Sequence, residues 1–143
     1  MPVKRFTWIL GHLHLNDNSL IPDRGDNKFD KLYKLRPLLN HLSERFSSLY
    51  KPGKYQSVDE SMIQFKGRSS LKQYMPGKPI KRGYKVRMRC DENGYAPQFE
   101  IYCGKLKEVE RNFGESVVKR LCEPLFGKNH WLFMDNFFTT YEL

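Results

Sequence analysis

The spacing of apolar residues changes near residue 55, and this change constrains the fold more than any other feature. Before it, apolar side chains recur every three or four residues at 6–13 and again at 29–46, the spacing of amphipathic helices. Pro37 lies inside the second pattern and lacks a backbone N–H donor, so we expect a kink or two joined helices there. After it, residues 84–90 alternate between apolar and basic side chains, as in a half-buried strand.

Residues 84–103 predict a β-hairpin. In its first strand Lys85, Arg87 and Arg89 alternate with apolar residues, so we expect them to form an exposed basic face. Asn93-Gly94 predicts a two-residue turn, because both turn positions tolerate positive φ.

Residues 112–122 predict a short helix, and HWLFMD (130–135) predicts a final strand. That strand is apolar on both faces, so we expect it in the middle of a sheet. The order strand, β-hairpin, helix, strand after a helical segment predicts an α/β (α+β) fold. We place the helical segment at 1–54 and the sheet domain at 55–143.

Basic residues are concentrated between Ser61 and Cys90, where no acidic residue occurs. The whole chain has 25 Lys and Arg against 16 Asp and Glu, a formal net charge of +9. A basic run is either an ordinary solvated face or a site for a polyanion. The absence of local acids favours the polyanion, because basic side chains on a loop can neutralise successive phosphates. The predicted phosphate-contacting residues are Lys66, Arg68, Lys72, Lys78, Lys81, Arg82, Lys85 and Arg87.

Other features narrow the class of partner and the compartment. No apolar run reaches the length of a membrane span, and the basic start is not followed by a small-residue cleavage site. The three separated cysteines suit a reducing compartment. We therefore expect no membrane partner and a cytosolic or nuclear protein. RNA is an alternative to DNA, but no aromatic RNA-recognition motif supports it.

Two aspartates lie in predicted strands. Asp59 lies in YQSVDESMIQF (55–65), and Asp135 closes HWLFMD. The ordinary interpretation of Asp135 is a cap for a helix beginning at FFTTYEL. Two carboxylates on neighbouring strands can instead hold Mg²⁺ or Mn²⁺, and two such metals about 4 Å apart promote phosphodiester chemistry. We expect the two carboxylates to meet across adjacent strands, within about 8 Å of each other.

Four stretches are spread along most of the chain: DKLYKLRPLLNHL (30–42), SVDESMIQFKGRSSLKQYMPGKPIKRGYKVRMRCDENGY (57–95), IYCGK (101–105) and MDNFFTT (134–140). In this order they resemble the piggyBac family of DNA transposases and their domesticated derivatives. The resemblance implies an RNase H-like catalytic domain of the DDD type, which cleaves DNA and joins strands. Asp59 matches the family's first catalytic, metal-binding aspartate, and Asp135 matches the second. Residues before Tyr55 match part of its dimerisation and DNA-binding region.

The family's third catalytic aspartate lies well downstream of the motif at 134–140. The resemblance therefore implies a truncated RNase H-like core over 55–143, from a fragment, a truncated gene model or a decayed element. We expect a two-metal site with Mg²⁺ or Mn²⁺ only in the complete core. We also expect the chain alone not to cleave or join DNA, unless Glu60 or Glu142 supplies the third ligand.

The resemblance also implies partners and a location. The partners are transposon-end DNA, target DNA and a second copy in a homodimer. The location is the nucleus. The alternative function is a domesticated, non-catalytic DNA-binding or interaction module. It uses nearly the same residues, so the sequence leaves both functions open.

Overall fold

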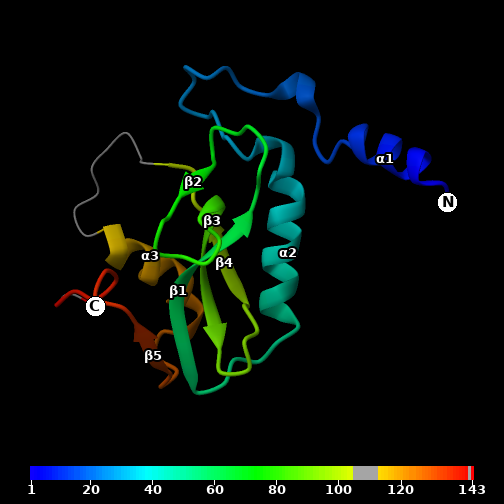
Figure 1. The fold of residues 1–143 in the computed structure, drawn as a ribbon. Helices are drawn as coiled ribbons and strands as arrows, with labels where there is room; N and C mark the ends of the chain where they lie inside the picture. Colours follow the sequence, from blue (N-terminus) through cyan, green and yellow to red (C-terminus); the bar gives the residue numbers. More distant parts are fainter. Residues whose placement is uncertain (105–112, 142) are drawn as a thin grey trace. The chain divides into compact units, whose positions relative to one another are not determined.

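The computed structural model describes residues 1–104, 113–141 and 143. The chain forms two compact units, Met1–Leu42 and Ser43–Leu143, and Figure 1 colours them along the sequence. The boundary between the units falls inside helix α2 (Arg36–Ser48). The functional roles expected for segments 1–54 and 55–143 stay predictions.

The first unit is helical, as the apolar spacing predicts. It contains α1 (Val3–Gly11), the short 3-10 helices η1 (Asn18–Leu20) and η2 (Tyr33–Leu35), and the start of α2. Pro37 lies in the first turn of α2, where a missing N–H costs nothing. The expected junction of two helices is thus found between η2 and α2. A helical pattern reaching back to residue 29 is wrong, because turns occupy the chain before η2.

The second unit is built on a sheet that, in the described residues, has five strands. They are β1 (Tyr55–Gln64), β2 (Gln73–Tyr74), β3 (Arg82–Asp91), β4 (Gln98–Ile101) and β5 (Trp131–Met134). The strand order is β2-β3-β1-β5, and β4 also pairs with β3. β1 runs antiparallel to β3 and parallel to β5. The predicted α/β order of strand, hairpin, helix and strand is confirmed.

Strands β3 and β4 form the predicted hairpin, but its turn has three residues instead of two. Asp91 N donates to the carbonyl of Tyr95 over 2.8 Å, which closes a turn of residues 92–94. Gly94 has φ +80°, a value that glycine adopts without strain. A three-residue hairpin turn needs positive φ only at its last position, so Gly94 carries the turn without Asn93.

The basic face predicted on β3 is wrong for Arg87 and Arg89, whose exposed fractions are 2% and 1%. The guanidinium of Arg87 lies 4.4 Å from the ring centroid of Phe113 in α3 (Phe113–Cys122) and pairs with Glu100. Arg89 Nη1 donates to Gln56 Oε1 over 3.0 Å. Burial lowers the pKa of both arginines. The alternation located the two faces of the strand, but it could not indicate that a helix covers the basic one.

The final strand β5 lies at the end of the sheet and not in its middle, since among the described strands it pairs only with β1. Leu132 and Met134 pack against the core, whereas Trp131 and Phe133 are exposed on the opposite face. An apolar run predicts two covered faces. In the described part of the chain only one face of β5 is covered.

The core of the second unit lies between the sheet and α3, whose place beside β1 and β5 is visible in Figure 1. Its buried residues are Val58, Val117, Val118, Leu121, Cys122 and Phe138. The expected helix is therefore confirmed as α3, with its predicted apolar side buried. Cys122 is buried, and Cys90 and Cys103 are half-buried. None of the described helices has the length and apolar character of a membrane span.

Asp91, at the end of β3, is a buried carboxylate that should make stability depend on pH. It accepts hydrogen bonds from Gly53 N (2.7 Å), Gln56 Nε2 (3.0 Å) and Asn93 N (3.1 Å). Burial alone raises the pKa of Asp91, but the hydrogen bonds from Asn93 and Gly53 outweigh it, so the pKa lies below its ordinary value. Ionised Asp91 therefore stabilises the fold above the pKa of an unfolded aspartate, about 3.9.

Asp91→Asn should lower the free energy of unfolding at pH 7. The difference from wild type should shrink as the pH falls from about 5 to below 4, because protonation of Asp91 removes the same stabilisation. Urea denaturation of both proteins across this range measures it. A difference that stays constant with pH would contradict this role for Asp91.

Candidate metal and DNA-binding site

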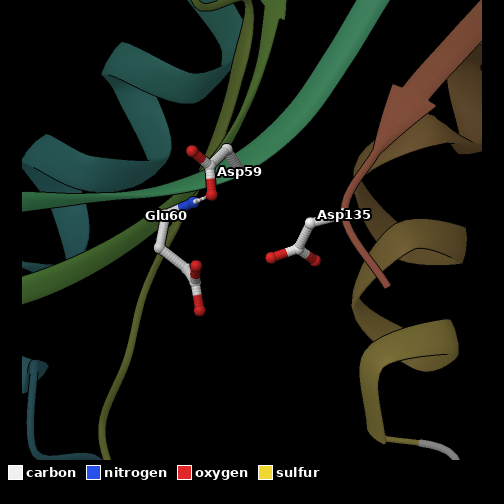
Figure 2. Close-up of side chains that lie close together, drawn as sticks. All are labelled: Asp59, Glu60 and Asp135. Carbon is white, nitrogen blue, oxygen red and sulfur yellow. Dashed lines mark hydrogen bonds between the residues drawn. The ribbon is translucent and has the colours of Figure 1, made fainter. Parts of the chain in front are cut away.

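The parallel pairing of β1 and β5 brings two aspartates to the same end of the sheet. Val58 lies beside Met134 in this pairing, and Asp59 and Asp135 are the next residues along each chain segment. Figure 2 shows the Asp135 carboxylate directed across a gap toward Asp59 and Glu60. One carboxylate oxygen from each of the three residues lies within 4.8 Å of the others. The predicted meeting of Asp59 and Asp135 across adjacent strands is confirmed.

Asp135 is held by the turn that follows β5. Its Oδ1 accepts a hydrogen bond from Phe137 N, and its carbonyl accepts bonds from Phe138 N and Thr139 Oγ1. The ordinary interpretation of Asp135 as a cap is thus correct, although it caps a turn and not the expected helix. The turn also lies against α3 at Gly114, where a Cβ would stand 2.4 Å from the carbonyl oxygen of Phe137.

Asp59 and Glu60 are adjacent in β1 yet contribute to the same cluster. The Asp59 side chain is largely exposed, and its Oδ1 accepts a hydrogen bond from Glu60 N over 2.7 Å. The Glu60 side chain is nearly buried. Alternation along a strand places neighbouring side chains on opposite faces, so strand pattern alone did not predict that Glu60 would join Asp59. Glu142, the other acid considered as a third ligand, lies outside the described residues.

Two lysines of the basic stretch reach this cluster. Lys78 Nζ lies 3.4 Å from Asp59 Oδ1 and 3.9 Å from Glu60 Oε2, and Lys85 Nζ pairs with Glu60 Oε1. Both lysines were predicted to contact phosphate, but here they neutralise carboxylates of β1. The carboxylates that balance these two lysines therefore belong to Asp59 and Glu60, which come just before the basic stretch.

The rest of the basic stretch divides by exposure. Arg87 is buried, which removes it from the predicted phosphate-contacting surface. Lys66, Arg68, Lys81 and Arg82 are exposed. Lys72 is half-buried and donates to the carbonyl of Gly67. One pocket gathers several of these side chains and is lined by Gln64, Phe65, Lys66, Lys72, Tyr74, Pro79, Ile80, Lys81 and Arg82.

The donor set of the cluster fits a hard divalent cation. Mg²⁺ and Mn²⁺ take carboxylate oxygens and retain exchangeable waters, and three such oxygens converge here. The two ammonium groups already drawn to the cluster are a second sign that it attracts cations. The catalytic roles of Asp59 and Asp135 stay predictions.

Comparisons with known proteins agree with this geometry. A family model described as Transposase IS4 matches residues 1–143. The human PiggyBac transposable element-derived protein 3 is 37% identical over 97% of this chain and 24% of its own length. The human PiggyBac transposable element-derived protein 2 is 28% identical over the same shares. The chain thus spans about a quarter of these relatives.

A solved structure has the same fold. It is the cryo-EM structure of a piggyBac transposase synaptic complex with hairpin DNA, which matches with a TM-score of 0.88 and 29% sequence identity. The match covers 99% of this chain and 30% of that one. The helices and sheet described above therefore correspond to one part of a larger protein in that structure.

Proposed function

Because the chain belongs to the piggyBac family of transposases and transposable element-derived proteins, we propose that it forms part of a metal-dependent site for cleaving and joining DNA. One observation carries this proposal. Two carboxylates that are distant in sequence, Asp59 and Asp135, converge at the same end of a parallel strand pair. An exposed basic surface from the same sheet supports DNA as the substrate.

In this proposal Asp59 and Asp135 hold Mg²⁺ or Mn²⁺, with Glu60 beside them. When bound, such ions activate the attacking oxygen and stabilise the leaving oxygen of a phosphodiester. The protein's own contribution is placement. The β1–β5 pairing sets the spacing of the carboxylates, the turn after β5 holds Asp135, and the lysine pairs hold Glu60.

The exposed residues Lys66, Arg68, Lys81 and Arg82 are proposed to contact the phosphates of duplex DNA, at transposon ends and at the target. Arg82 also lies over the ring of Tyr74, with 5.2 Å between its guanidinium carbon and the ring centroid. This contact pre-orders the guanidinium at the surface. The same proposal includes a homodimer and a nuclear location, as expected for a protein acting on chromosomal DNA.

The alternative is a domesticated, non-catalytic DNA-binding module. One observation favours it: Glu60 already has two ammonium partners, and Asp59 has one. Carboxylates with cationic partners do not need a metal to balance their charge. Metal affinity therefore separates the two functions.

Electron paramagnetic resonance of Mn²⁺ measures that affinity. We expect the wild-type chain to bind Mn²⁺ with a Kd of about 10⁻⁴ to 10⁻³ M, the range of small open carboxylate sites. An Asp59→Asn, Asp135→Asn double variant should bind at least about tenfold more weakly, since two of its ligands lose their charge. Glu123→Gln removes an exposed charge elsewhere and should leave the affinity unchanged. Equal affinity in wild type and the double variant would favour the non-catalytic module.

A further inference from the structure

Lys78 connects the acidic cluster to the basic stretch, and its contacts resemble those of a bound cation. Its Nζ lies 3.4 Å from Asp59 Oδ1 and 3.5 Å from Asp59 Oδ2, so it faces both oxygens of one carboxylate. The same atom donates to the carbonyl oxygen of Glu60 over 3.0 Å. An ammonium in this position takes up oxygen atoms that a divalent cation would also use.

Lys85 differs from Lys78 in how firmly it is held. The Lys85 side chain is 14% exposed, pairs with Glu60, and has its Nζ 5.9 Å from the ring centroids of both Tyr102 and Phe137. The Lys78 side chain is 29% exposed, and its distances to the carboxylates are longer. It lies between β2 and β3, in the loop that begins after Tyr74. Lys78 can therefore leave the carboxylates without disturbing a packed core.

We propose that Lys78 is a positioning residue that exchanges one anionic partner for another. Without a divalent cation it pairs with Asp59 and Glu60. With the cation bound, it turns to a DNA phosphate beside the cluster. This inference rests on the proposed function, because it requires a metal site at Asp59 and Asp135.

The physical reason is repulsion between like charges. A divalent cation and an ammonium group cannot share the oxygens of Asp59 at contact distance without a large electrostatic cost. The half-buried side chain of Lys78 is exposed enough for its ammonium to move away, and the exposed basic residues of the same stretch would bring phosphates near. Metal binding would thus add one phosphate contact, and by linkage DNA would strengthen metal binding by the same factor.

The first experiment measures Mn²⁺ binding without DNA, by electron paramagnetic resonance. Lys78→Gln should bind Mn²⁺ about fivefold more tightly than wild type, because the internal competitor is gone. Lys78→Arg keeps the positive charge and should restore near wild-type affinity. Lys51→Gln is the matched control, since Lys51 is an exposed lysine outside the basic stretch, and it should not change Mn²⁺ affinity.

The second experiment measures the salt dependence of binding to duplex DNA with and without Mn²⁺. In wild type, Mn²⁺ should make the slope of log K against log salt steeper by about 0.9, the value for one phosphate. Lys78→Gln should lose this change, whereas Lys51→Gln should keep it. General effects of Mn²⁺ on the DNA are common to all variants and cancel in the comparison.

Two results would contradict the proposal that Lys78 exchanges its carboxylate partners for a DNA phosphate. One is Mn²⁺ affinity that does not rise in Lys78→Gln, and the other is a metal-dependent change in slope that persists in that variant. Failure of the proposed function would give a different result. In that case the Asp59→Asn, Asp135→Asn double variant would bind Mn²⁺ with the same affinity as wild type. Circular dichroism of each variant confirms that it is folded.

Discussion

Replacing Phe138 with alanine should lower the free energy of unfolding by about 3–5 kcal/mol, the usual cost of removing a buried phenylalanine ring. Phe138 is 0% exposed and belongs to the core cluster that joins β1 to α3. Its neighbours there include Val58 and Val117, so truncation leaves a cavity between the sheet and the helix. Urea denaturation followed by circular dichroism measures the change.

The same substitution should weaken Mn²⁺ binding, because Phe138 fixes the turn that carries Asp135. Phe138 N donates to the carbonyl of Asp135, and the buried ring holds that turn against α3. Phe126→Ala is the control, since Phe126 is an exposed aromatic residue near the end of α3. It should change the free energy of unfolding by about 0.5 kcal/mol or less. An equal loss of stability in both variants would contradict the role assigned to Phe138.

Local patterns in the sequence were enough to predict most elements of the second unit. The helix α3, the hairpin of β3 and β4, and the final strand each follow from apolar spacing or turn residues. What the patterns could not predict is what covers each face. Arg87 and Arg89 alternate with apolar residues as exposed residues would, yet α3 covers them. That cover depends on packing between segments that are distant in sequence.

At the candidate site, too, the sequence predicted some features and missed others. Asp59 and Asp135 were predicted from the family motifs and the strand order, and the β1–β5 pairing brings them together. The lysine partners were not predicted. Lys85 pairs with Glu60 because β1 and β3 are antiparallel neighbours, and Lys78 returns to β1 from the loop after β2. A one-residue change in strand register would move these side chains to the other face, so a charge pattern alone cannot specify such pairs.

The exposed part of the basic stretch should dominate DNA binding. Replacing Lys66, Lys81 and Arg82 with glutamine should reduce the slope of log K against log salt by about 2–3 units, because each neutralised phosphate contributes about 0.9. These three residues line one pocket and are all exposed. Lys78 and Lys85 are left unchanged because they pair with carboxylates in the absence of metal. Fluorescence anisotropy with a labelled duplex, titrated at several salt concentrations, gives the slope.

A matched variant separates this local surface from the total charge of the protein. Lys51, Lys54 and Lys128 are exposed lysines outside the basic stretch, and replacing them with glutamine changes the net charge by the same amount. If DNA phosphates bind to Lys66, Lys81 and Arg82, this second triple variant should keep a slope of log K against log salt within about one unit of wild type. Equal losses in the two variants would mean that DNA responds to net charge over the whole molecule. The exposed residues Lys66, Lys81 and Arg82 would then have no special part in binding DNA.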